Sequence, residues 1–419
     1  MTAAADNKNY LIRLLAVVLT GILAGLSGMV LALILHAIQH QAFGYSHGQL
    51  VGSESFLQGV TDSSWPRRIM AIVAGGAVAG FGWWLLGRYG QKRVSIASAV
   101  ANPSVPMPAG TTTIHALLQI VTVALGSPLG REVAPREMGA LGAGMVARKL
   151  GLLEDESRTL IACGAGAGLA AVYNVPLAGA LFSLEVMLLS FSWEKTLAAM
   201  ITSAIAAWTA TLGLGEESQY HFTSDILPHS FLWWAIISGP ILGAGAWLFR
   251  KATSTARSHV QSNWQMPVFC LLAFSLLAAL SLYFPQLPGN GKGPMQLALS
   301  DALGFPGAAM LLVLKMVVIL AVLRGGAEGG LLTPGLAVGG LASLLLCMLW
   351  QQLLPGGDYG SFALVGAAAF LAASMQMPIT AVALVMEFTH MDHSYLAPTL
   401  LCAAGAFLTC RILDKNDSF

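Results

Sequence analysis

One glycine and proline pattern occurs twice in the most apolar parts of this chain. In the first copy, GAGAGLAAVYNVPLAGALFSLEVM, 12 positions lead from Gly164 to Pro176 and 9 more lead to Glu185. The second copy, GAAAFLAASMQMPITAVALVMEF, keeps both spacings from Gly366 through Pro378 to its own glutamate. This shared register predicts two copies of one repeat, each with a glycine-rich helix start inside an apolar run.

A second glycine and proline segment precedes each copy and extends the repeat. The segments are GSPLGREVAPREMGALGAG at 126–144 and RGGAEGGLLTPGLAVGG at 324–340, and the small-residue stretches at 19–39 and 237–254 also resemble each other. The order of these segments predicts an N-terminal transmembrane half at 1–215, a polar connector at 216–229 and an inverted C-terminal half at 230–419. No soluble regulatory domain is expected.

The apolar runs indicate that both halves lie in a lipid bilayer. Hydrophobic residues make up 56% of the chain and charged residues only 10%, which is typical of a polytopic, all-α membrane protein. Several runs are shorter than the roughly 20 residues of a straight span, so tilted and re-entrant helices are expected. The run at 11–38 is too long for the core of a signal peptide and is interpreted as the first span.

The charges and cysteines exclude several classes of function. Lys and Arg total 21 against 20 acidic residues, which leaves no basic field for nucleic acid. The five cysteines show no CxxC spacing, so buried thiols are expected and no metal or cofactor is predicted. The ionisable residues in the apolar segments are isolated from one another, so the chain is not predicted to be an enzyme.

Inverted halves with broken helices are typical of transporters that hold their substrate near the membrane midplane. The first N–H groups of a helix have no acceptor within the helix and carry partial positive charge, which favours an anion. The repeat therefore predicts a pathway for an inorganic anion.

Glu132, in the segment Gly130-Arg131-Glu132-Val133, is the acidic residue most suited to this pathway. It lies at a predicted helix start, where its carboxylate can compete with the anion for N–H groups and can leave when protonated. We therefore predict that Glu132 is both gate and proton carrier. The alternative is a structural carboxylate that caps the helix or pairs with Arg131 or Arg136.

Four motifs of the chain resemble those of the CLC family of anion channels and proton-coupled anion antiporters. The motifs GREVAP, GLAAVYNVPLAGALFSLEV, GNGKGP and GGLLTP carry the resemblance in order over nearly the whole chain. It implies the CLC-type fold, a homodimer with one pore per subunit, and exchange of an anion for protons with Glu132 as the gating glutamate. It also implies a multi-pass protein of the bacterial inner membrane.

The resemblance places the anion at two helix starts. It implies that GGLLTP contributes backbone N–H groups, and that the GREVAP segment faces the same anion. The predicted anion-binding residues of these two segments are Gly130, Arg131, Val133, Gly330, Leu331, Leu332 and Thr333. Thr333 offers a hydroxyl donor where the family has a small apolar residue; alternatively it is an ordinary helix N-cap before Pro334.

Three departures from the family pattern bear on the mechanism. Gln91 stands near the place of the serine that marks chloride selectivity, and Val186 occupies the position of the internal proton-transfer glutamate, beside Glu185. Phe419 aligns with the pore tyrosine, whose hydroxyl is missing unless Tyr395 replaces it. These departures resemble the bacterial branch that exports fluoride, so fluoride is predicted over chloride.

Other interpretations remain open. Val186 and Phe419 favour a passive CLC chloride channel, and an unrelated secondary transporter is a distant alternative. Lys315 lies in an apolar segment, where we expect its amine to snorkel or to face a water-filled vestibule. His115 and His390 have no partner at ligand spacing in the sequence, and no role is assigned to them.

Overall fold

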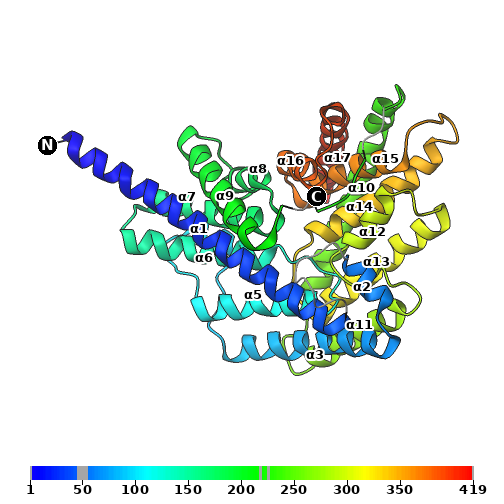
Figure 1. Cartoon of the computed structure of the whole chain (residues 1–419), viewed down its shortest axis with the longest axis horizontal. Coiled ribbons are helices and arrows are strands. Elements are labelled where there is room, and N and C mark those ends of the chain that lie inside the picture. The colour runs from blue at the N-terminus through cyan, green and yellow to red at the C-terminus, as the bar shows by residue number, and fades with distance from the viewer. Residues whose placement is uncertain (1, 45–54, 217–218, 224–226, 418–419) are drawn as a thin grey trace. The chain divides into compact units, whose positions relative to one another are not determined.

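The computed structural model describes residues 2–44, 55–216, 219–223 and 227–417 (Figure 1). Within these residues all regular structure is helical except for one isolated antiparallel bridge between Gly130 and Gly330. The all-α prediction is therefore confirmed.

The first series of helices runs from the N-terminus to Leu214. It consists of α1 (Thr2–Phe43), α2 (Phe56–Asp62), α3 (Trp65–Tyr89), α4 (Ile96–Ala101), α5 (Ala109–Ala124), α6 (Val133–Leu150), α7 (Glu154–Tyr173), α8 (Pro176–Phe182), the π-helix η1 (Ser183–Leu188) and α9 (Trp193–Leu214).

The second series begins at Phe231 and repeats the order of the first once α2 is set aside. It consists of α10 (Phe231–Ser258), α11 (Met266–Ser281), α12 (Lys292–Leu299), α13 (Phe305–Gly325), α14 (Leu332–Trp350), α15 (Tyr359–Met375), α16 (Pro378–Thr389), the 3₁₀-helix η2 (His393–Tyr395) and α17 (Leu396–Asn416).

Seven helices in the described part of the chain are long and apolar enough to cross a membrane. The candidate spans within them begin at Tyr10, Trp65, Trp193, Phe231, Phe305, Leu332 and His393. Other apolar helices, among them α5, α8, α11, α15 and α16, are too short for a straight span.

The repeated glycine and proline pattern forms the same local break in both series. Asn174 ends α7 with φ 55°, and Gln376 ends α15 with the same φ. A left-handed residue terminates a helix because it turns the chain out of the hydrogen-bonding register. The following proline, Pro176 or Pro378, then starts α8 or α16, where its missing N–H costs nothing.

Contacts between residues divide the chain into two compact units. Unit 1 comprises residues 1–34, 85–120 and 132–217, and unit 2 comprises 35–84, 121–131 and 218–419. The boundary crosses the GREVAP segment between Arg131 and Glu132. The predicted overlay of residues 1–215 on 230–419, joined by 216–229, stays a prediction.

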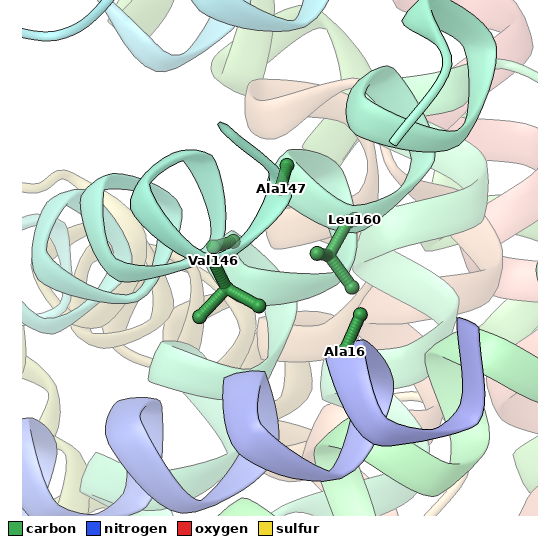
Figure 2. Close-up of a cluster of buried hydrophobic side chains, with 5 residues drawn as sticks. Ala16, Val146, Ala147 and Leu160 are labelled. Atoms are coloured by element: carbon green, nitrogen blue, oxygen red, sulfur yellow. The ribbon is translucent and has the colours of Figure 1, made fainter. Parts of the chain in front are cut away.

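Unit 1 is packed through small side chains. Ala16 of α1 lies against Val146 and Ala147 of α6 and Leu160 of α7 (Figure 2). A Cβ atom on Gly139 of α6 would lie 2.1 Å from the backbone oxygen of Gly164 in α7. Such close contact between backbones is how membrane helices associate without a hydrophobic driving force between them.

Unit 2 combines small residues with a cluster of aromatic rings. Its helices α10, α14, α15 and α17 lie side by side in Figure 1. Phe231 and Trp234 of α10 pack edge-on against Phe362 of α15, with centroids 4.6 and 4.9 Å apart. The buried ring of Tyr395 joins this cluster.

Candidate functional site

The two glycine motifs are joined directly by backbone hydrogen bonds within unit 2. The Gly130 N–H donates to the Gly330 carbonyl at 2.8 Å, and the Gly330 N–H donates back to the Gly130 carbonyl at 2.9 Å. A Cβ atom on Gly329 would lie 2.7 Å from Cβ of Leu129, so only glycine allows this approach. The loop before α6 and the loop before α14 therefore meet at these two glycines. That the two segments share one anion stays a prediction.

A third loop, from the GNGKGP motif, lies against both of these segments in unit 2. The Gly289 N–H donates to the Gly126 carbonyl at 3.0 Å. Gly291 has φ 106°, and a Cβ there would lie 2.8 Å from Cβ of Ala337 and 3.1 Å from the Thr333 carbonyl oxygen. The GNGKGP glycines thus let this loop approach the first turns of α14.

Lys315 of α13 holds the GNGKGP loop, which corrects the sequence-based expectation for this residue. Its ammonium is fully buried and donates to the carbonyls of Leu287 at 2.8 Å and Gly289 at 2.7 Å. It therefore neither snorkels nor faces an open vestibule. A buried charge loses its hydrogen bonds to water, and here the two carbonyl oxygens accept hydrogen bonds from the ammonium in place of that water.

Replacing Lys315 by methionine should destabilise the protein, because two buried carbonyls lose a charged donor. A hydrogen bond to a charged group contributes about 1.5–3 kcal/mol, and we expect a net loss of roughly 2–4 kcal/mol, since burial of the charge is also relieved. Thermal unfolding of detergent-solubilised protein measures this effect. Lys251→Met is the control, because Lys251 is exposed and pairs with Asp417 at 2.8 Å. Equal melting temperatures for both variants would contradict the structural role of Lys315.

Arg257, near the end of α10, supports the GGLLTP segment and was missed in the sequence. Its Nη2 donates to the Gly329 carbonyl at 2.9 Å. The two residues are 72 positions apart, so no local pattern indicates the contact.

Thr333 lies at the start of α14 without a hydrogen-bond partner for its hydroxyl. The helix N-cap is Leu331, and Thr333 is the second residue of the helix. The N-cap interpretation of Thr333 is therefore wrong. Its side chain is only 3% exposed, and its Oγ1 makes no hydrogen bond. Leu331 is half-buried and Leu332 is buried.

Glu132 occupies the N-cap position of α6 and is fully buried. Its backbone is already helical, and its side chain makes no cap hydrogen bond, so the capping alternative is wrong. Instead the Tyr173 hydroxyl donates to Glu132 Oε2 at 3.3 Å within unit 1. Arg136 places its guanidinium over the Phe182 ring at 4.8 Å and also interacts electrostatically with Glu132, so the alternative that Glu132 pairs with an arginine stays open. Tyr173 lies in the GLAAVYNVP motif, but no sequence signal indicated its contact with Glu132.

The other residues predicted to bind the anion or line the pore differ in burial and in their contacts. Arg131 and Val133, on either side of Glu132, are half-buried. Gln91 is exposed, and its backbone N–H donates to Thr111 Oγ1 at 3.1 Å. The Tyr395 hydroxyl lies 2.6 Å from Ser361 Oγ at the start of α15. Phe419 lies outside the described residues.

The apolar helices and the joined glycine loops define an all-helical, polytopic membrane protein. A family model described as "Voltage gated chloride channel" matches residues 71–411. The chain therefore belongs to the CLC family and is a transmembrane anion transporter of that family.

Named relatives and solved structures agree with this membership. The chain is 29% identical to the "Voltage-gated ClC-type chloride channel ClcB" of Salmonella typhi, over 97% of both chains. It is 27% identical to the "H(+)/Cl(-) exchange transporter ClcA" of Vibrio campbellii, over 94% of this chain and 85% of the relative.

Two solved structures share the fold. A slow cyanobacterial Cl⁻/H⁺ antiporter has a TM-score of 0.83 and 19% identity, over 96% of this chain and 95% of the other. A CLC-type fluoride/proton antiporter has a TM-score of 0.70 and 20% identity, over 98% and 97%. The CLC-type fold predicted from the motifs is confirmed.

Proposed function

We propose that this protein exchanges an inorganic anion for protons and that Glu132 is the gate and the proton carrier. The observation that supports this most is the mutual hydrogen bonding of Gly130 and Gly330. This pair of hydrogen bonds fixes the loop that contains Gly130, and Glu132 comes two positions after Gly130 in the chain. Burying a carboxylate in a membrane protein costs free energy, and carboxylates that are nevertheless buried there commonly mark ion or proton pathways.

In this proposal the anion is held by the first turn of α14. The N–H groups of Gly130 and Gly330 are engaged with each other, so these glycines fix the loops and do not donate to the anion. The donors are the N–H groups of Leu331 and Leu332 and the hydroxyl of Thr333. Arg131 adds positive charge. The roles of Val133, Gln91 and Phe419 at the anion stay predictions from the sequence, and the Gln91 N–H already donates to Thr111 Oγ1.

We propose chloride as the transported anion. The sequence departures at Gln91 and Val186 predicted fluoride, but the named relatives do not support that preference. The relatives from Salmonella typhi and Vibrio campbellii are both named for chloride. A fluoride/proton antiporter shares the fold, but at 20% identity it supports the fold alone.

A passive chloride channel is the competing function, favoured by Val186 and by the channel name of the Salmonella relative. One experiment separates the two. Purified protein in liposomes receives an outward chloride gradient, and the internal pH is recorded with a trapped dye. An exchanger moves protons against their gradient, whereas a channel moves chloride alone. The same assay with fluoride in place of chloride tests which anion is transported. A fluoride flux equal to or faster than the chloride flux would overturn the assignment of chloride.

We also propose a homodimer in the bacterial inner membrane. The helices that follow the repeated motifs expose large apolar side chains, which fit either lipid or a second copy of the chain. They include Trp208 and Leu212 on α9, and Leu408 and Ile412 on α17. Cross-linking in lipid should trap dimers, and monomers at every lipid dilution would contradict the proposal.

A further inference from the structure

A buried acid–imidazole pair joins α5 to α6 in unit 1. His115 and Glu137 are only 2% and 6% exposed, and Nδ1 of His115 lies 2.7 Å from Oε2 of Glu137. Ionisable groups inside a membrane protein are expensive, and chains of His and Glu are typical of proton relays. His115 lies outside the glycine motifs described above, and Glu137 follows the GREVAP motif by two positions.

The hydrogen bonds around this pair assign the position of the proton. Nη1 of Arg93 contacts Nε2 of His115. A guanidinium can only donate, so Nε2 accepts and Nδ1 carries the hydrogen that faces Glu137. Nε2 of Gln119 donates to Glu137 Oε2 at 3.1 Å. Its 2.9 Å distance from Nδ1 joins two donors in this tautomer, so it is a contact and not a hydrogen bond.

The two ends of this arrangement differ in their access to water. Arg93 is exposed and lies in the loop between α3 and α4, whereas Gln119 is fully buried. The imidazole therefore connects a solvent-exposed residue with a buried carboxylate. A purely structural ion pair would need no such exposed end.

We propose that His115 and Glu137 form an inner proton relay toward Glu132, and that Arg93 closes its solvent end. This inference rests on the proposed function, since it supplies the proton that Glu132 exchanges. It also gives the chain an inner carboxylate, although Val186 occupies the place where the family resemblance implied one.

Each step of the relay conserves the proton. When the Arg93 guanidinium moves aside, water delivers a proton to Nε2 of His115. The imidazolium then releases its Nδ1 proton to Oε2 of Glu137, leaving a neutral imidazole and a neutral carboxylic acid. Glu137 then passes its proton on to water on the side of Glu132 and becomes a carboxylate again. The imidazole exchanges its Nε2 proton for one on Nδ1 through water, which restores the first tautomer and completes the cycle.

The charges that face the pair come from the α3–α4 loop and from α6. Arg93 faces the imidazole, and Arg136 interacts electrostatically with both Glu137 and Glu132. Glu137 follows Glu132 by five positions on α6, about 7.5 Å along the helix axis. A short chain of water molecules must carry the proton across this gap.

The test measures proton flux and chloride flux separately in liposomes for the variants Glu137→Gln and His115→Gln. Both changes keep hydrogen-bonding groups but remove the ability to pass a proton. We expect proton flux to fall about tenfold or more while chloride flux persists. The double variant should lose no more than either single variant, because both residues act in one relay. Glu154→Gln, at an exposed carboxylate of α7, is the matched control and should keep wild-type coupling.

Arg93→Ala supplies a test that does not depend on changing a buried residue. Removing the exposed guanidinium opens Nε2 to water, so proton flux should rise severalfold relative to chloride flux. Unchanged proton flux in Arg93→Ala, or wild-type proton flux in Glu137→Gln, overturns the relay and leaves the proposed function intact. A wild-type protein that moves chloride without protons overturns both.

Discussion

Glu132→Gln should abolish chloride-driven proton movement while the protein still folds and still conducts chloride. Glutamine has nearly the same shape, and its side-chain oxygen can still accept the hydrogen bond from Tyr173. It cannot gain or lose a proton in the transport cycle. Since a positioned acid–base group contributes about 10²–10⁴-fold, we expect proton flux to fall by about a hundredfold or more.

The measurement is the pH change inside liposomes under a chloride gradient, together with chloride release through the same protein. Glu154→Gln again serves as the control, because it makes the same chemical change at an exposed position. Persistent proton pumping by purified Glu132→Gln would exclude Glu132 as the carrier. Loss of chloride release as well would indicate that the substitution damages the fold or the pathway.

The sequence predicts those elements of the site whose backbone conformation depends on residues in the same short segment. Glycines and prolines at fixed spacing predicted the helix breaks before Pro176 and Pro378, because backbone conformation depends on these residues themselves. The same logic placed Glu132 at the start of α6. The repeat predicted that the corresponding helix starts lie near each other, and Gly130 does meet Gly330. The single anion between them was implied by the family resemblance and stays a prediction.

The contacts that support the site had no such signal. Lys315 reaches the Leu287 carbonyl across 28 positions, and His115 reaches Glu137 across 22. Each appears in the sequence as an isolated ionisable residue in an apolar helix. Its partner depends on how two helices pack, which the periodicity of either helix alone does not determine. The cost of burying a charge indicates that a partner exists but does not identify it.

Replacing Thr333, whose hydroxyl has no hydrogen-bond partner, should change stability and anion binding in opposite directions. Thr333→Val keeps the shape of the side chain and removes a buried hydroxyl that has no partner in the structure. Leaving a polar group buried and unsatisfied costs about 1–3 kcal/mol, so the variant without anion should be at least as stable as the wild type.

Chloride binding by Thr333→Val should weaken, because a hydrogen bond to a charged group contributes about 1.5–3 kcal/mol, or roughly 10- to 150-fold in affinity. Calorimetric titration of detergent-solubilised protein with chloride measures the affinity, and thermal unfolding in chloride-free buffer measures the stability. Thr389→Val is the matched control, since the Thr389 hydroxyl donates to the Val385 carbonyl of its own helix at 2.8 Å. Unchanged chloride affinity in Thr333→Val would remove this hydroxyl from the anion site. A stability loss without an affinity change would instead mean that the hydroxyl serves the fold, because a donor reserved for the anion stabilises only the occupied protein.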